Sequence, residues 1–213
     1  MGIAEDLSQV FEEVGVLFTI EDTEIQEYMD FEYNVQVSNP FVREFAVDGM
    51  FKSNTSVSGG SIINIHEAGS RFLIVNFLPE LFENAAIAYN ATLYKCNVYG
   101  MCYRQTQTDA EKRYDSTYKT DFKWEKQFET WAPFTTDIRG ISSGLRDHED
   151  FAFINVKEKN LYLPESLDIQ VGDRWYISSD EYYKIDNVER HRFNGAIICD
   201  VSEDTRGGDY AEE

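Results

Sequence analysis

GDRWYISSDEYYKIDNVERHRFNGAIICDV, residues 172–201, contains three short runs of alternating side chains separated by tight polar turns. Gly172-Asp173 turns the chain into the first run, in which Trp175 and Ile177 fall on one face. Residues 178–180 supply a second turn, after which aromatic and polar side chains alternate again. Because a period of two is typical of half-buried strands, the segment predicts a three-stranded antiparallel meander.

A similar layout occurs earlier in the chain, at residues 60–97. Both stretches give a strand that begins at a glycine, a short polar loop, an aromatic-led strand, an intervening segment and an apolar strand with a cysteine. One interpretation is a duplicated three-stranded meander, and the other is two unrelated hairpins. Short strands joined by short turns are typical of small barrels and sandwiches.

The strongest helical pattern lies at the N-terminus, over residues 4–14. Apolar residues recur there at spacings of three and four, acidic residues occupy the first turn, and Gly15 supplies a stop. The apolar positions are Leu7, Val10, Phe11 and Val14.

The remaining pattern is mostly extended, with a few ambiguous segments. Short helical pieces are predicted at 22–29, from a capping-box pattern, and at 79–85, where Pro79 fits the first helical position. A hairpin is predicted around Gly100, and 117–131 fits both the helical and the strand period. We expect strands at 15–20, 31–37, 46–58, 61–65, 71–76, 151–156, 160–164, 168–178, 181–189 and 195–204.

These elements predict a mainly β fold, α+β only at the N-terminus, with small antiparallel barrel or sandwich units and one short helix. The polar stretch 106–115 is interpreted as a linker between halves or as a hairpin tip. We therefore expect an N-terminal unit at 1–115, a barrel-like unit at 116–206 and a flexible acidic tail at 207–213.

The charge of the chain limits its functions. The 213 residues include 39 acidic and 19 basic side chains, which gives a formal net charge of −20. DNA affinity depends on lysines and arginines that neutralise phosphates, so sequence-specific nucleic-acid binding is not expected. Three interpretations remain: a DNA mimic, the wall of a channel through which DNA slides, or a surface that is acidic for solubility.

The sequence also indicates in which cellular compartment the protein is made. Three cysteines are too few for the disulfide framework of a secreted protein. No apolar run approaches the ~18 residues that span a bilayer, and the first residues lack the basic and apolar regions of a signal peptide. We expect assembly in a cytoplasm and no contact with a membrane.

No catalytic template fits the chain. The phosphate-binding, dinucleotide-binding and hydrolase glycine motifs are absent from the sequence. The three histidines are scattered and are expected on the surface. Two acidic clusters could bind a divalent cation, although such clusters are usually solvated. The histidines are His66, His148 and His191, and the acidic residues are Asp147, Glu149 and Asp150, then Glu203 and Asp204.

Cys96 and Cys102 flank the hairpin that is predicted at Gly100. Opposed across it, they could form a disulfide or half of a metal site, but ordinary buried thiols are the simpler interpretation. We therefore expect no enzyme activity, no catalytic residue, no cofactor and no metal.

One compact basic run interrupts the acidic chain at residues 190–193. It could meet an acidic face of a neighbouring subunit, or it is only a charged strand end. Aromatic and arginine side chains are enriched at subunit interfaces. The candidate interface residues are therefore Arg190, His191, Arg192, Phe193, Trp175 and Tyr182.

Two tracts resemble known proteins. Residues 162–206, with "LP", "GDR", "EYYKI", "RHRF" and "EDTR" in that order, resemble the C-terminal barrel of small proteins encoded among tailed-phage structural genes. Residues 71–100, RFLIVNFLPELFENAAIAYNATLYKCNVYG, are similar to the middle of such proteins. Together the two tracts cover about a third of the chain.

The resemblance implies a virion component of the head–tail connector or neck, of the head-completion or stopper type, and offers no catalytic residues. Such a protein forms a ring with copies of itself and contacts portal, tail or other neck proteins, while DNA passes through its lumen. A tail-completion or baseplate protein and an acidic DNA-mimic inhibitor are the alternatives.

Overall fold

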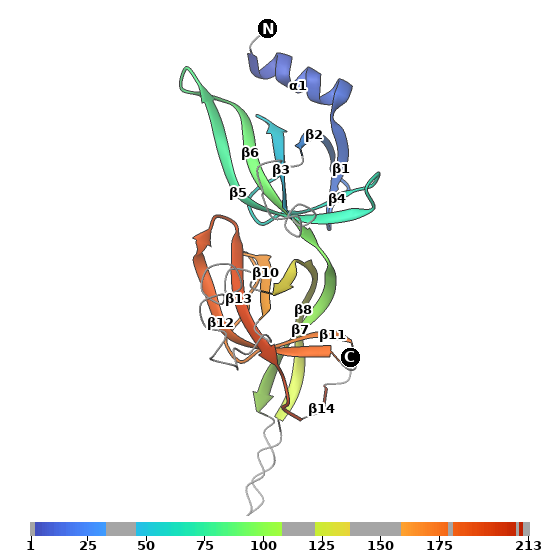
Figure 1. The fold of residues 1–213 in the computed structure, drawn as a ribbon, viewed down its shortest axis with the longest axis vertical. Helices are drawn as coiled ribbons and strands as arrows, with labels where there is room; N and C mark the ends of the chain where they lie inside the picture. Colours follow the sequence, from blue (N-terminus) through green and yellow to red (C-terminus); the bar gives the residue numbers. More distant parts are fainter. Residues whose placement is uncertain are drawn as a thin grey trace, which may run out of the picture.

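The computed structural model describes residues 3–32, 46–107, 122–136, 159–178, 181–207 and 209–210. Within them the chain is mainly β with one short N-terminal helix, as the sequence predicted. Two barrel-like units are stacked along the long axis of the molecule (Figure 1). The helix lies at one end of this stack.

The first barrel is a closed antiparallel sheet with the strand order β1-β2-β3-β6-β5-β4. Its interior holds the apolar side chains of alternate strand positions, and Phe18 and Phe51 meet there edge to face, with 5.6 Å between ring centroids. The strands are β1 (Val16–Ile20), β2 (Gln26–Glu32), β3 (Ala46–Lys52), β4 (Ile62–Ile65), β5 (Ser70–Phe82) and β6 (Ala85–Cys96).

Helix α1 (Ile3–Val14) packs against β2, β3 and β6. Phe11 is its buried side chain, and the Phe11 carbonyl accepts a hydrogen bond from the Gly15 N–H at 2.9 Å. A Cβ atom at Gly15 would lie 2.3 Å from that carbonyl oxygen. The predicted helix and its glycine stop are therefore confirmed.

The second sheet has the order β14-β8-β7-β11-β12-β13-β10-β9. Trp175 and Ile177 lie on the same face of β11, as their alternation predicted, and the structure shows that this face is turned to the core. The strands are β7 (Val98–Gln107), β8 (Phe122–Ala132), β9 (Phe134–Thr136), β10 (Lys159–Pro164), β11 (Arg174–Ser178), β12 (Glu181–Phe193), β13 (Ala196–Glu203) and β14 (Asp209–Tyr210).

This sheet also curls into a barrel, because β8 and β9 are parts of one bent strand separated by Pro133. Proline has no N–H to donate, so the ladder breaks there. The side chain of Asn97 fills the break: its Oδ1 accepts from the Phe134 N–H and its Nδ2 donates to the Phe134 carbonyl, both at 2.7 Å. We call β7 to β13 the second barrel.

Each ladder of the first barrel then has a counterpart in the second. Strands β1, β3, β4, β5 and β6 correspond to β7, β10, β11, β12 and β13, in that order, and β2 corresponds to the bent strand made of β8 and β9. With this matching, the six strand pairs of the first barrel recur in the second. The middle strands β5 and β12 each have 13 residues, and each ends in a two-residue turn within FENA (82–85) or FNGA (193–196). This shared layout favours duplication over two unrelated hairpins.

The two barrels share an apolar junction. Leu73, Val75 and Cys96 of the first barrel pack with Ala196 of the second, and Tyr94 meets Tyr162 edge to face at 5.3 Å. Aromatic pairs of this kind add to the stabilisation from buried area.

Two glycine turns also touch at this junction. A Cβ atom on Gly195, whose φ is 86°, would lie 2.2 Å from the carbonyl carbon of Gly59. The Asn76 N–H donates to the Asn194 carbonyl at 3.3 Å. The close approach of backbones explains why glycines occupy both turns.

Two predicted helical pieces are strands. Residues 26–29 belong to β2, because Thr23 serves the β1–β2 turn by donating to the Ile20 carbonyl instead of capping a helix. Residues 79–82 extend β5, where they pair with the start of β6. Pro79 is tolerated beside a bulge, where a missing N–H is least costly.

The hairpin predicted at Gly100 is also wrong. Gly100 lies inside β7, and the ring of Trp175 on the neighbouring strand lies against it, 2.4 Å from where a Cβ atom would be. The glycine therefore serves a close contact and not a turn.

The chain passes between the sheets at Asn97, whereas the expected division lay at 115/116. The segment that was interpreted as a linker or a hairpin tip follows β7 and precedes β8, and these strands pair along their length from Val98 to Gln107, so it does not join the two halves. In the expected tail, Asp209 and Tyr210 pair in parallel with β8. The hairpin of 61–65 with 71–76 is confirmed, and the strand predicted at 151–156 lies outside the described residues.

Candidate assembly surfaces

The structure separates the six candidate interface residues. Trp175 has no exposed surface and belongs to the core of the second barrel. Phe193 packs at the junction between the barrels, 6.2 Å from the ring of Tyr94. Both side chains make contacts within the chain, and Trp175, which is fully buried, is not available to a neighbouring subunit, whereas Phe193 stays partly exposed.

The basic run is only partly available at the surface. Arg190 donates to the Ile169 carbonyl at 2.9 Å, and Arg192 lies 3.7 Å from the exposed carboxylate of Glu189. His191 and Arg192 are exposed. Of the six candidates, these two are therefore best placed to contact another subunit.

Tyr182 belongs to a stack around Arg174. The Arg174 guanidinium lies between two rings, 3.9 Å from the ring of Trp124 and 4.8 Å from that of Tyr182. It also donates from Nε to the Asp204 carboxylate at 2.8 Å. The side chains of this ion pair are 3% and 1% exposed, so both charges lie inside the protein.

Arg206 completes this group, which we call the arginine clamp: Arg174, Asp204, Arg206 and Trp124. Arg206 donates to Asp204 at 2.7 Å and to the Gly172 carbonyl at 2.8 Å. Burial by itself raises the pKa of the Asp204 carboxyl, but the hydrogen bonds from Arg206 and Arg174 outweigh it and hold the pKa well below its usual range. The clamp ties the C-terminal segment to the barrel.

A second ion pair fixes the turn before β11. Arg104 donates to buried Asp173 through Nε at 3.0 Å and Nη2 at 2.9 Å, and to exposed Asp168 at 2.9 Å. The hydrogen bond from Arg104 lowers the pKa of Asp168. Asp173 also accepts from the Gln170 N–H. The aspartates and arginines of "GDR" and "EDTR" thus form ion pairs within the fold.

The structure decides between the two interpretations of Cys96 and Cys102. All three are free and buried; Cys96 lies at the junction, while Cys102 and Cys199 lie in the core of the second barrel. Burial raises the pKa of the Cys199 thiol to about 12 and raises the pKa of the other two thiols as well. Ordinary buried thiols are therefore the correct interpretation.

The candidate metal ligands gain little support. His66 shares a hydrogen bond of 2.7 Å with Thr19, and both carboxylate oxygens of Asp204 are bound by arginines. The described residues contain no cluster of three or more histidine, cysteine or acidic side chains fit to hold a metal. The other acidic cluster and its histidine lie outside the described residues; they are Asp147, His148, Glu149 and Asp150.

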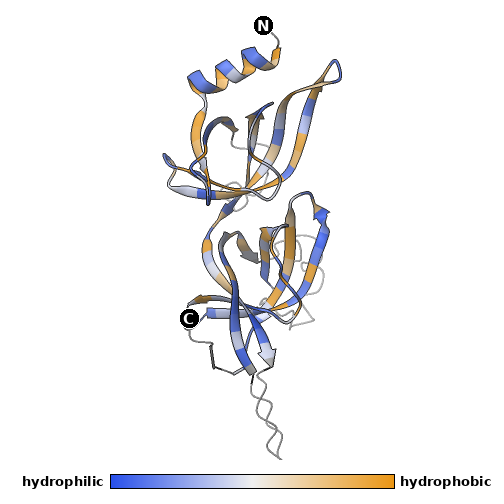
Figure 2. Cartoon of the chain, turned by 180° about the vertical axis from the view of Figure 1, so that it is seen from behind, coloured by the Kyte–Doolittle hydropathy of each residue, from blue (hydrophilic) through white to orange (hydrophobic). Residues whose placement is uncertain are grey.

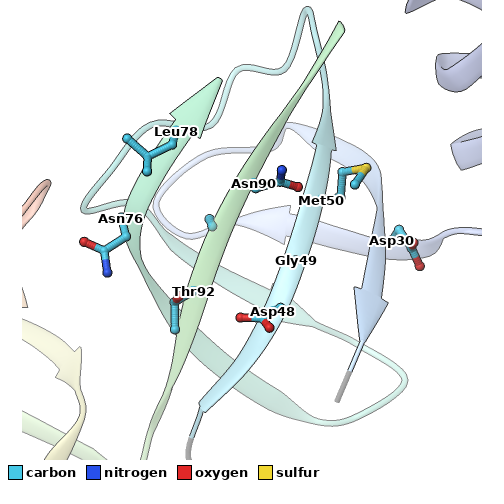
Figure 3. Close-up of a pocket in the computed structure, with 9 residues that line it drawn as sticks. Asp30, Asp48, Gly49, Met50, Asn76, Leu78, Asn90 and Thr92 are labelled. Atoms are coloured by element: carbon cyan, nitrogen blue, oxygen red, sulfur yellow. The ribbon is translucent and has the colours of Figure 1, made fainter. Parts of the chain in front are cut away.

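One hollow lies on the outer wall of the first barrel, over β2, β3, β6 and β5, with a volume of about 430 Å³ (Figure 3). Carboxylates of Asp30 and Asp48, amides of Asn76 and Asn90, and the apolar side chain of Leu78 line it. This set accepts and donates hydrogen bonds but contains no nucleophile beside a base. The hollow therefore suits contact with a polar group better than catalysis.

A second cleft of about 320 Å³ lies between the barrels. Its walls carry four carboxylates, from Glu21, Asp22, Glu129 and Glu165. Glu21 is paired with Arg71 at 3.1 Å, and Arg71 in turn lies 4.4 Å from the ring centroid of Trp131. The cleft thus adds polar contacts to the apolar junction.

The sequence analysis missed one surface, at the end of the molecule that carries α1. Large apolar side chains are exposed there on the helix and on the β5–β6 hairpin; they are Ile3, Val10, Val14, Leu78, Leu81 and Phe82. The signal was present in PELFENA (79–85), whose neighbouring apolar residues Leu81 and Phe82 are both exposed.

No helix in the described part of the chain is long and apolar enough to cross a membrane. Comparisons with protein families, with curated proteins and with solved structures found no match to this chain.

Proposed function

We propose that the protein is a non-enzymatic structural component of a tailed-phage particle, a neck or head–tail connector protein that forms a ring. In this role it joins portal or capsid to tail and its ring surrounds the DNA channel. It is assembled in the host cytoplasm and ends in the virion. The proposal starts from the resemblance of residues 71–100 and 162–206 to phage structural proteins.

The observation that carries the proposal is the position of these two tracts. The first tract forms most of β5 and all of β6, the second forms the end of β10 and all of β11 to β13, and the two meet at the junction between the barrels. Tyr94 from the first tract contacts Tyr162 and Phe193 from the second. The resembling residues thus build one continuous scaffold, as expected for a structural part.

The use of the polar residues also supports a structural role. In the arginine clamp, both oxygens of Asp204 are bound by Arg174 and Arg206. A general acid or base must exchange a proton with a substrate, and a carboxylate held in this way is poorly suited to do so. The chemistry of the clamp therefore serves the stability of the fold.

The net charge of −20 fits a channel wall. Packaged DNA is repelled by a carboxylate-rich surface, so it would slide past without adhering. Several acidic residues are neutralised inside the fold, among them Glu21, Asp173 and Asp204. The acidic residues that remain exposed are the ones available to face DNA or a neighbour.

Imaging of intact particles tests the proposal directly. We expect density for the two stacked barrels in a ring between portal and tail, with the acidic residues of one face toward the lumen. Density at the far end of the tail would favour the tail-completion or baseplate alternative. Absence from all particles would refute a virion role, and inhibition of a nuclease would then test the DNA-mimic alternative.

A matched pair of variants tests the ring itself. Arg192→Glu reverses an exposed charge of the basic run, and Lys184→Glu reverses an exposed charge on the same strand. If the basic run contacts a neighbour, Arg192→Glu prevents incorporation into the ring and Lys184→Glu does not. Equal incorporation of both variants would exclude the basic run as a ring contact.

A further inference from the structure

Helix α1 carries an apolar stripe that the first barrel leaves largely uncovered. Ile3, Leu7, Val10 and Val14 follow each other at spacings of four, three and four, so they lie along one face of the helix. Ile3 is 46%, Val10 is 48% and Val14 is 78% exposed, whereas Phe11 is 4% exposed. Phe11 therefore anchors the helix, and the stripe is available for a second contact.

The tip of the β5–β6 hairpin adds further apolar surface at the same end of the molecule. Leu78, Leu81 and Phe82 are 57%, 64% and 47% exposed. In both views the helix and the hairpin tip lie at the end opposite the second barrel (Figures 1 and 2). Exposed apolar side chains that gather in this way mark interaction sites. We call the helix stripe and the hairpin tip the distal surface.

The charge of the distal surface selects its partner. Helix α1 contains four acidic side chains, Glu5, Asp6, Glu12 and Glu13, and no lysine or arginine. The stretch 72–94, which includes the hairpin tip, has two acidic residues and no basic one. The helix and the hairpin tip therefore combine exposed apolar side chains with acidic side chains and contribute no basic side chain of their own.

A second copy of this chain fits the distal surface poorly. Pairing two α1 helices along their stripes would place Asp6 and Glu13 beside the contact, with no lysine or arginine on either helix to oppose them. Like charges at such flanking positions destabilise helix pairs, and opposite charges determine which partner is accepted. The charge pattern thus favours a different protein.

We propose that the distal surface docks into an apolar groove on another protein and that lysine and arginine side chains border this groove. The apolar stripe supplies contact area, and the acidic flanks supply specificity for the basic border. The inference concerns the first barrel and its helix, and it does not depend on the proposed role in a virion.

Binding to two model peptides tests the inference on the full-length chain. Both peptides are amphipathic helices with the same leucine face; one has lysine and the other glutamate at all flanking positions. Fluorescence anisotropy measures their binding to the native chain and to the double variant Val10→Ser/Val14→Ser. Val171→Ser is the control, because Val171 is 62% exposed but lies in a loop of the second barrel.

We expect the lysine peptide to bind at least about tenfold more tightly than the glutamate peptide, and less tightly as salt rises. The double variant should weaken this binding by about tenfold to a hundredfold, since two valines no longer bury apolar surface. Both variants should keep the fold, because all substituted side chains are exposed. Circular dichroism checks this.

Three results would overturn the inference. If the native chain binds both peptides equally well, the acidic flanks do not select a basic partner. If the native chain and the double variant bind the lysine peptide equally well, the apolar stripe of α1 is not part of the contact. Self-association of the native chain in sedimentation experiments, lost in the double variant, would identify a second copy as the occupant.

Discussion

Replacement of Asp204 by asparagine is the sharpest test of the arginine clamp. Asparagine has nearly the same shape as aspartate but no charge, so the substitution leaves Arg174 buried and without its counter-ion. The Arg174 side chain is 3% exposed and its guanidinium lies 3.9 Å from the ring of Trp124, so water cannot readily replace the lost carboxylate. The cost should therefore be large.

The expected loss is about 3–5 kcal/mol of the free energy of unfolding, the range for removal of one partner from a buried ion pair. The matched control is Asp186→Asn. Asp186 also pairs with a basic residue at 2.8 Å, but its side chain is 36% exposed and that of its partner Lys184 is 41% exposed. Exposed pairs contribute about 0–1 kcal/mol, so the control should change stability little.

The effect of Asp204 should also depend on pH. Its pKa is lowered in the folded state, so the unfolded chain binds the proton more readily. The stabilisation is therefore complete above the unfolded pKa of about 4 and declines as pH falls below that value toward the lower folded pKa. The difference between native chain and Asp204→Asn should be constant near neutral pH and shrink in acid.

Urea unfolding followed by tryptophan fluorescence measures these effects. The chain has three tryptophans, and all of them lie in the second barrel, so the signal reports on the unit that contains the clamp. A loss below about 1 kcal/mol, or one equal to that of Asp186→Asn, would refute the argument that the buried pair holds the C-terminal segment in place.

Three further predictions follow from the junction and the core. Gly195→Ala should lower the free energy of unfolding by more than about 2 kcal/mol, whereas Gly172→Ala should cost about 1 kcal/mol, because both have positive φ but only Gly195 faces a backbone within 3 Å. Arg71→Met should shift the fluorescence of Trp131, since it removes the cation over that ring. In the native chain at about pH 8, a thiol reagent should label none of the cysteines rapidly, and in urea it should label all three: Cys96, Cys102 and Cys199.

Each of these predictions has a contrary outcome. Equal costs for the two glycine variants would mean that the turns at the junction are not in close contact. An unchanged emission spectrum for Arg71→Met would place that guanidinium away from the tryptophan. Rapid labelling of a native thiol, or fewer than three thiols in urea, would contradict the buried and unpaired state of the cysteines.

Local patterns in the sequence predicted much of the fold. The alternation around Trp175 and Ile177 correctly placed both side chains on one face of a strand, and the spacing of apolar residues in 4–14 predicted the helix with its stop at Gly15. The two meanders were visible as an echo in the sequence, because a strand of period two and a tight turn are determined by neighbouring residues.

Contacts between distant residues decided the rest. Gly100 looked like a turn but accommodates the ring of Trp175, and residues 79–82 looked helical but pair with β6. Asp204 looked like part of a solvated acidic cluster, yet it lies buried against Arg174, 30 positions earlier in the chain. A residue's own sequence neighbourhood determines its backbone preference, whereas its burial and its ladder partner depend on which strands the barrel brings beside it.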